Sequence, residues 1–167
     1  MILKSYSKIN LTLDVNKKLK SGLHNIQSYF CLIDLFDKIK IKKINDNKDK
    51  VKFRGKFANK INKSNNSVLK TLSLLRKKKI ISAYYSVLIN KNIPVFAGLG
   101  GGTSNAFFLA KYFSKKKIDQ NLRFILNKKI GTDIQLFFFN MGFLKNLKKV
   151  NNFRVKYRFC FLLIFPN

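Results

Sequence analysis

The sequence has few of the residues from which metal centres and disulfide frameworks are built. Among its 167 residues there is no glutamate and no tryptophan, and there are only one histidine, two cysteines and two prolines. Cys31 and Cys160 both lie in apolar runs, where a free thiol behaves as a small hydrophobic side chain. Two such cysteines and a single histidine exclude a disulfide framework and the usual metal-ligand spacings.

Long hydrophobic runs are also absent. The apolar stretches, such as 136–139 and 159–165, are too short to cross a bilayer. The N-terminus alternates apolar with polar residues and does not resemble a signal peptide. We therefore expect a cytoplasmic protein with no membrane partner, long enough to bury the core of one domain.

Acidic residues are scarce. Seven aspartates accompany 35 lysines and arginines, which gives a formal net charge of +28. A charge of this size often marks a nucleic-acid-binding protein. Here, however, the basic residues are nearly all lysines and are spread along the chain, and asparagine, isoleucine and phenylalanine are also in excess. This pattern favours the compositional bias of an AT-rich genome over a set of arginine contacts to bases, so we expect no specific nucleic-acid partner. The charge would still attract anionic substrates.

The most informative stretch of the chain is rich in glycine. It runs from Pro94 to Ala106 and reads Pro-Val-Phe-Ala-Gly-Leu-Gly-Gly-Gly-Thr-Ser-Asn-Ala. Glycine permits positive φ angles and lets a ligand approach main-chain N–H groups that a Cβ would shield. Residues 83–89 before the stretch are typical of a strand. Residues 106–113 after it favour a helix, which one of the polar residues 103–105 would cap.

A glycine loop that leads into a helix predicts a phosphate site. The unpaired N–H groups of the first turn and the positive end of the helix dipole both point at whatever the loop holds. Two well-known phosphate motifs fit poorly: Walker A would need a lysine where Gly102 lies, and the dinucleotide fingerprint is matched only in part. The alternative is a flexible turn, although three consecutive glycines are costly in backbone entropy.

The rest of the sequence predicts strands and helices in a mixed order. Residues alternate from Ser5 to Val15, which is typical of a half-buried strand with Lys8 on its polar side. The buried side of that strand would carry Ile9, Leu11, Leu13 and Val15. Further strands are expected at 26–36, 38–42, 51–53 and 157–165. Helices are expected from a Ser67 cap to the basic stop at 76–79, and at 120–129 after an Asp119 cap.

Two further residues are candidates for function. Asp133 follows Gly131 at the edge of a strongly apolar run, and is either a plain cap or a carboxylate directed into a cleft. His24 lies in a polar loop after Gly22, and taken alone it is an exposed or hydrogen-bonded loop residue.

Three separated segments together resemble the GHMP kinases, and most closely the branch that acts on 4-diphosphocytidyl-2-C-methyl-D-erythritol. Residues 7–13, Ser-Lys-Ile-Asn-Leu-Thr-Leu, are similar to the Ala-Lys-Ile-Asn-Leu opening of that branch, and Gly22-Leu23-His24 to its Gly-Tyr-His. The glycine stretch is similar to Pro-x-x-x-Gly-Leu-Gly-Gly-Gly-Ser-Ser, with Thr103 in place of the first serine. Residues 131–137, Gly-Thr-Asp-Ile-Gln-Leu-Phe, are similar to Gly-Ala-Asp-Val-Pro-Phe-Phe.

The resemblance implies a fold and a division into domains. The expected fold is α+β, of the ribosomal protein S5 domain 2 type, with a mixed and mostly antiparallel sheet and helices on one face. Residues 1–155 would form the N-terminal, ATP-binding domain, and residues 156–167 the first strand of a second domain that the sequence does not contain. Such an uncovered strand is a predicted site of pairing or self-association.

The resemblance also implies an activity. It is the ATP-dependent phosphorylation of the 2-hydroxyl of 4-diphosphocytidyl-2-C-methyl-D-erythritol, a small-molecule substrate of the non-mevalonate isoprenoid precursor pathway. Asp133 would be the catalytic base and Lys8 its partner. Asn10 and His24 would contact the substrate, with His24 reading the cytosine ring.

ATP and Mg²⁺ are the cofactors that the resemblance implies. Ser104 would contact the metal ion. The residues expected to bind ATP are Pro94, Val95, Phe96, Ala97, Gly98, Leu99, Gly100, Gly101, Gly102, Thr103, Ser104 and Asn66.

Departures from the family pattern keep alternatives open. Leu23 replaces an aromatic residue that stacks on cytosine, and Gln135 replaces a proline. Stacking of this kind contributes on the order of 1–3 kcal/mol per base in nucleic-acid complexes. The alternatives are another small-molecule kinase of the same superfamily, a non-catalytic nucleotide-binding remnant and, last, a basic nucleic-acid-binding protein.

Overall fold

A long, bent strand organises the sheet. In this computed structural model, residues 2–18, 22, 24–115, 117–146, 149–153 and 159–165 are described. The strands are β1 (Ile2–Asn10), β2 (Asp14–Lys18), β3 (His24–Ile44), β4 (Lys50–Arg54), β5 (Tyr84–Asn90), β6 (Met141–Asn146) and β7 (Lys149–Asn152). The helices are α1 (Ser67–Lys77), α2 (Gly101–Phe113), α3 (Gln120–Lys129) and the 3₁₀ helix η1 (Thr132–Phe138).

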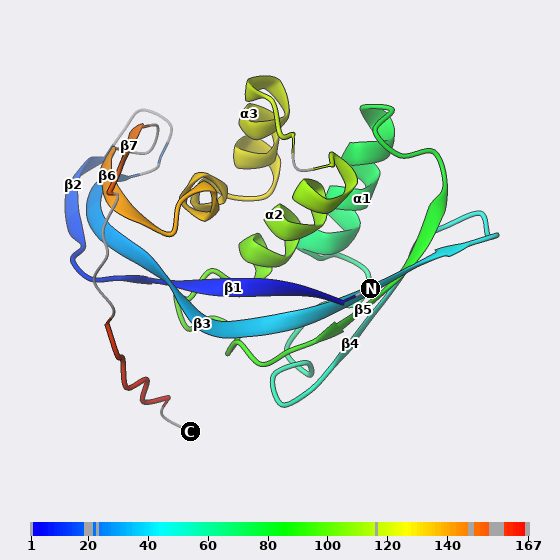
Figure 1. Ribbon diagram of the computed structural model, residues 1–167, viewed down its shortest axis with the longest axis horizontal. Helices are drawn as coiled ribbons and strands as arrows, with labels where there is room; N and C mark the ends of the chain where they lie inside the picture. The colour runs from blue at the N-terminus through cyan, green and yellow to red at the C-terminus, as the bar shows by residue number, and fades with distance from the viewer. Residues whose placement is uncertain are drawn as a thin grey trace.

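Strand β3 pairs with four neighbours and is therefore the centre of the sheet. Strands β1, β2, β5 and β6 all lie antiparallel to it, and β6 is antiparallel to β7. Among the described strands, only β4 and β5 pair in parallel. The helices lie together on one face of this sheet (Figure 1). The predicted α+β fold, with a mostly antiparallel sheet and helices on one face, is confirmed.

The core lies between the helices and the β3–β5 part of the sheet. Its fully buried members include Leu72 and Leu75 of α1, Phe107 of α2, and Val87 and Ile89 of β5. These apolar residues recur at helical spacing in α1 and at alternate positions in β5, as their sequences predict. None of the described helices is long and apolar enough to span a membrane.

The opening strand differs from its prediction. It ends at Asn10, and Leu11, Leu13 and Val15 are 43%, 52% and 60% exposed, so the predicted buried face is wrong. The fully buried positions on β1 are Ser5 and Ser7. The reason is that α2 packs closely on this strand, where the hydroxyl oxygens of Ser5 and Ser104 are 2.7 Å apart, and only small side chains fit.

Two helix starts also differ from their predictions. Asn66, not Ser67, caps α1, because its side-chain oxygen accepts a hydrogen bond from the N–H of Leu69 at 3.0 Å. Helix α2 begins earlier than expected, at Gly101, after Gly100 in the left-handed region with φ of 69°. The polar residues 103–105 therefore lie inside the helix rather than at its cap. Helix α3 and its Asp119 cap are confirmed.

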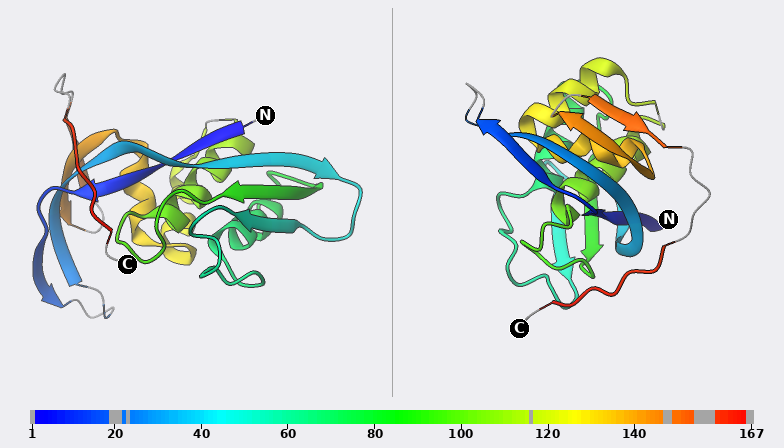
Figure 2. Two further views of the ribbon diagram at one scale, coloured as in Figure 1. Left: turned by 90° about the horizontal axis from the view of Figure 1, so that it is seen from below. Right: turned by 90° about the vertical axis from the view of Figure 1, so that its left-hand side faces the viewer.

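The end of the described chain lies across the sheet from the helices. Residues 159–165 contain no strand, so the strand expected at 157–165 is not present over them. They run below the sheet in Figure 1 and across its near side in the left view of Figure 2. Residues 157 and 158 and the expected domain boundary at 155/156 lie outside the described residues, so the division into domains stays a prediction.

Candidate active site

The glycine loop, Pro94 to Thr103, lines a pocket of about 440 Å³. We call this the glycine-loop pocket. Its other walls come from residues 60–62 and 65–67, from Lys91 just after β5, from Phe53, and from Asn105 in α2. All the residues expected to bind ATP line it except Ser104. The loop and the start of α1 are distant in sequence, so the fold brings this set together.

Two helix N-termini converge on the glycine-loop pocket. Asn66 caps α1 and Gly100 caps α2, and both line the pocket. The Ser67 hydroxyl donates a hydrogen bond of 2.7 Å to the carbonyl of Gly102, which joins the two starts. Neither helix has an acidic residue in its first turn, so nothing there neutralises the positive ends of the two dipoles. An anion such as phosphate suits this field.

Two glycines of the loop lie in close contact with the side chains behind them. A Cβ on Gly100 would lie 3.0 Å from the Phe137 ring and 3.3 Å from Cγ of Lys8. A Cβ on Gly101 would lie 3.0 Å from a methyl group of Ile93 and 3.2 Å from Nζ of Lys91. The loop therefore packs its backbone directly against the Lys8 and Lys91 side chains.

Lys8 and Asp133 form an ion pair beside the loop. Nζ of Lys8 lies 3.4 Å from Oδ2 of Asp133, and the two side chains are 5% and 33% exposed. The backbone N–H of Lys8 also donates to the carbonyl of Leu99 at 3.0 Å, which ties β1 to the glycine loop. The register of β1 on β3 shifts between Tyr6 and Ser7. Such a bulge redirects side chains, and it precedes the buried Lys8.

Asp133 reaches this place because η1 approaches the start of α2. A Cβ on Gly131, just before η1, would lie 3.4 Å from the Thr103 hydroxyl. The result is a buried ammonium and a partly accessible carboxylate next to a loop suited to phosphate. A carboxylate can accept a proton from a substrate hydroxyl, and an ammonium can stabilise negative charge on a transferred group.

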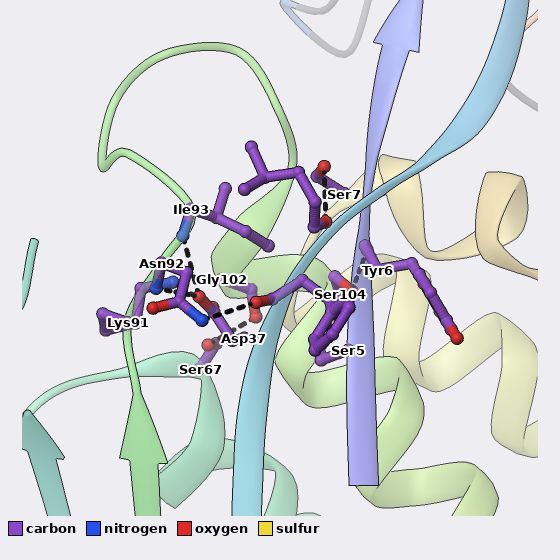
Figure 3. A network of polar contacts seen from close by, with 12 residues as sticks. Ser5, Tyr6, Ser7, Asp37, Ser67, Lys91, Asn92, Ile93, Gly102 and Ser104 are labelled. Atoms are coloured by element: carbon purple, nitrogen blue, oxygen red, sulfur yellow. Dashed lines mark hydrogen bonds and ion pairs between the residues drawn. The ribbon is translucent and has the colours of Figure 1, made fainter. Parts of the chain in front are cut away.

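Ser104 cannot serve as the predicted metal contact. It is fully buried, and its hydroxyl donates to the Tyr6 carbonyl at 2.5 Å and lies 2.7 Å from the hydroxyl of Ser5. Its backbone N–H is bonded to the carbonyl of Gly100 inside the helix. Figure 3 shows the side chain directed at β1. The prediction was wrong because the residue faces the sheet, where it joins α2 to β1.

Asn66 lines the pocket with a side chain that is already bonded. Its oxygen accepts from Leu69, and its amide nitrogen donates to the carbonyls of Asn62 and Lys63. It therefore holds the wall of the pocket in place, and a direct contact to ATP stays a prediction.

The two residues expected at the substrate differ in their surroundings. Asn10 ends β1 and accepts a hydrogen bond from Nζ of Lys8 at 3.3 Å. His24 is exposed at the start of β3, opposite Lys18. Asn10 pairs with Phe30, so His24 lies roughly 20 Å further along the strand. The β2–β3 hairpin curves toward the helix side in Figure 1, and Leu23 lies outside the described residues.

Two pocket residues were missed from the sequence. Lys91 is 2% exposed and pairs with the fully buried Asp37. Asn105 is 2% exposed, and its side-chain oxygen has no hydrogen-bond partner among the described residues. A buried acceptor without a partner is costly, so a donor from a ligand or water suits it. The sequence signal for Asn105 is its position one turn after the two glycines of α2. Helical side chains lean toward the preceding turn, so this side chain is expected to point toward the glycine loop.

The described residues contain no group of three or more histidines, cysteines and acids that could hold a metal ion. Mg²⁺ needs no such group, since it is often held by one or two carboxylates together with substrate phosphates.

The similarity of this chain to known proteins is extensive, although no family model matches it. It is 37% identical over 170 residues to the 4-diphosphocytidyl-2-C-methyl-D-erythritol kinase of Pelagibacter ubique (strain HTCC1062), a match that covers 99% of this chain and 60% of that relative. It is 38% identical over 143 residues to the protein of the same name from Ureaplasma parvum serovar 3, covering 82% of this chain and 52% of the relative. The chain thus spans only part of the length of these relatives.

Solved structures share the fold. A 4-(cytidine 5'-diphospho)-2C-methyl-D-erythritol kinase superposes with a TM-score of 0.65 at 21% identity, covering 92% of this chain and 55% of that one. The mevalonate kinase of Methanococcus jannaschii superposes with a TM-score of 0.58 at 18% identity, covering 93% and 56%. Over the part of these proteins that it spans, the chain therefore shares the fold of these two kinases, and its sequence is similar to those of 4-diphosphocytidyl-2-C-methyl-D-erythritol kinases.

Proposed function

We propose that the chain transfers the γ-phosphoryl group of ATP to the 2-hydroxyl of 4-diphosphocytidyl-2-C-methyl-D-erythritol. The observation that carries the proposal is the contact of three elements: the glycine loop lies against Lys8, and Lys8 lies 3.4 Å from Asp133. The names of the relatives supply the substrate, and the relatives are longer than this chain.

The nucleotide would lie in the glycine-loop pocket. Its phosphates would meet the N-termini of α1 and α2, where no acidic residue opposes them. The buried oxygen of Asn105 offers a hydrogen-bond acceptor in the same pocket, whereas the ammonium of Lys91 is already paired with Asp37. The fit to an anionic ligand with hydrogen-bond donors supports ATP.

Phosphoryl transfer leaves little covalent work for the protein, so position and charge dominate. Asp133 is the proposed base that accepts the hydroxyl proton, which its partial exposure permits. Lys8 would stabilise the negative charge on the transferred group. Its hydrogen bond to Leu99 keeps it next to the loop that holds the donor.

Bound Mg²⁺ would neutralise charge on the ATP phosphates. The hydroxyl of Thr103, which lines the pocket and lies close to Gly131, is the proposed protein group beside it. Asn10 and His24 are the proposed substrate contacts, with Asn10 next to Lys8 and His24 reading the cytosine ring.

The test is substrate-dependent ADP release. Purified protein is mixed with ATP, Mg²⁺ and either the cytidyl substrate or mevalonate, and the phosphorylated product is identified by mass spectrometry. We expect ADP and product only with the cytidyl substrate. Product from mevalonate alone would support another small-molecule kinase, and ATP binding with no turnover would support a non-catalytic nucleotide-binding protein.

A further inference from the structure

Asp37 is fully buried in the middle of β3 and does not line the glycine-loop pocket. Its carboxylate is nevertheless bonded to three groups that lie just before the glycine loop. One oxygen forms an ion pair with Nζ of Lys91, and the other accepts from the backbone N–H groups of Asn92 at 2.8 Å and Ile93 at 2.9 Å. Figure 3 shows this network between β3 and the loop.

These bonds begin where the sheet hydrogen bonds stop. The last residue of β5 that pairs with β3 is Asn90, opposite Lys38, the neighbour of Asp37. Beyond it the N–H groups of Asn92 and Ile93 have no strand opposite them, and buried N–H groups need partners. The Asp37 carboxylate supplies them. The side-chain amide of Asn92 adds a bond of 3.0 Å to the Phe36 carbonyl.

The same carboxylate fixes the position of a buried charge. A lysine that is 2% exposed is stable in its charged form only beside an anion. Nζ of Lys91 lies under the first turn of α2, 3.2 Å from the place of a Cβ on Gly101. Asp37 therefore holds both the backbone at the entrance of the loop and the ammonium beneath it.

The exit of the loop is held separately. The Leu99 carbonyl accepts from Lys8, and the Gly102 carbonyl accepts from Ser67. Between the two anchored ends, Phe96 is 89% exposed with φ of 64°. A loop fixed at both ends loses less conformational entropy when it closes on a ligand.

We propose that Asp37 is a positioning residue for the glycine loop, acting through Lys91, Asn92 and Ile93 on the geometry of the phosphate site. The part of this proposal that concerns ATP rests on the proposed function. The part that concerns loop order does not, because it can be measured without a ligand.

The chain offers a matched control in Asp49. This carboxylate is 8% exposed, pairs with Arg76 through both oxygens at 3.0 Å, and accepts from the N–H of Tyr85 at 2.9 Å. It thus holds the start of β5 as Asp37 holds the end, and it does not line the pocket. Asp37→Asn and Asp49→Asn each remove one charge from a similar network.

The experiment measures amide hydrogen exchange at residues 92–101 in the ligand-free protein, together with the Kd for ATP, at a temperature where both variants are folded. For Asp37→Asn we expect exchange in this segment to rise about tenfold and ATP binding to weaken about tenfold, as for one charged hydrogen bond. The KM of the cytidyl substrate should stay within about twofold of the wild-type value. A general loss of structure would instead raise both this KM and the Kd for ATP. Asp49→Asn should change neither the loop exchange nor the ATP Kd.

A second variant distinguishes the loss of loop order from misfolding caused by an unpaired buried charge. Asp37→Asn/Lys91→Gln leaves no unpaired charge in the core, and it should keep the faster loop exchange because Asn92 and Ile93 still lose their charged acceptor. Equal loop exchange in the Asp37 and Asp49 variants, or wild-type exchange in the double variant, would overturn the proposal. If the loop responds as expected but the wild-type chain binds no ATP, the positioning role holds and the proposed function fails.

Discussion

Nζ of Lys8 lies 3.4 Å from Oδ2 of Asp133, and the same lysine donates its backbone N–H to Leu99 in the glycine loop. One residue of β1 thus touches both the proposed base and the proposed phosphate site. This relation explains why Lys8 is 5% exposed while its partner is 33% exposed. The lysine is enclosed by the loop, and the carboxylate remains open to a substrate.

Replacing Lys8 tests whether its charge acts on the reaction. Lys8→Met keeps most of the side-chain volume and should lower kcat by about 10²–10³, as loss of one group that stabilises transition-state charge does. The ATP Kd should change little. Lys4→Met is the control, because Lys4 lies on the same strand but its ammonium lies over the Phe36 ring, 4.4 Å from the centroid. Equal kcat in the two variants would remove Lys8 from the mechanism.

Two glycines with similar backbone angles separate strain from packing. Gly98 and Gly100 have φ of 72° and 69°, so alanine at either position carries the same backbone cost of about 1–2 kcal/mol. Only at Gly100 would the new Cβ meet other groups, the Phe137 ring and the Lys8 side chain. We expect a fall in kcat for Gly100→Ala and near-normal kcat for Gly98→Ala, with both melting temperatures lowered. The opposite order of kcat would contradict the packing of Lys8 on the loop.

The hydroxyls of Ser104 and Thr103 have different predicted roles. Ser104→Ala should lower the free energy of unfolding by about 1–3 kcal/mol, because the Tyr6 carbonyl and the Ser5 hydroxyl lose a buried partner. It should leave the Mg²⁺ concentration for half-maximal activity unchanged. Thr103→Val should raise that concentration with little effect on stability. Magnesium titrations and chemical denaturation of both variants decide between these outcomes.

Much of the fold was predictable because its signals are local. The strand before the glycine loop, helix α3 with its Asp119 cap, and the apolar stripe of α1 follow from residues within a few positions of one another. The buried face of β1 was not predictable, because it depends on partners that are distant in the chain: Ser5 contacts Ser104 of α2, and Ser7 donates a hydrogen bond to the Leu35 carbonyl of β3. The prediction assumed that the apolar residues of an alternating strand are buried, whereas on β1 the buried positions carry serines.

The site residues that lie in the motifs carrying the resemblance were predictable, and the buried residues that support the glycine loop were not. Lys8, Asp133 and the loop lie in segments whose residues carry the resemblance. Asp37 lies between the predicted strands 26–36 and 38–42, and Lys91 follows the strand predicted at 83–89, so neither residue lies in a motif that carries the resemblance. Only the tertiary structure shows that they neutralise each other in the core. Ser104 was misassigned because the sequence does not give the rotation of α2 about its axis.

The two cysteines should differ in reactivity with pH. Burial raises the pKa of the Cys31 thiol, which is 4% exposed, whereas Cys160 is exposed. Iodoacetamide at pH 8 should modify Cys160 first, as mass spectrometry can show. Because the raised pKa favours the neutral thiol in the folded state, the stability from this group is complete below its ordinary value of 9.0 and is lost as the pH rises above it. Rapid alkylation of Cys31 in the folded protein would contradict its burial.

The most direct test of the account is single-turnover phosphorylation of the cytidyl substrate by the wild-type chain and Asp133→Asn, with the ATP Kd measured on both. Asp46→Asn is the control, since Asp46 pairs with Lys50 in a turn between β3 and β4. We predict that Asp133→Asn lowers the rate by about 10²–10⁴, the usual contribution of a general base, with an ATP Kd within threefold of the wild type and of the control. A rate for Asp133→Asn equal to that of the wild type would contradict the role of the Lys8–Asp133 pair in the chemistry.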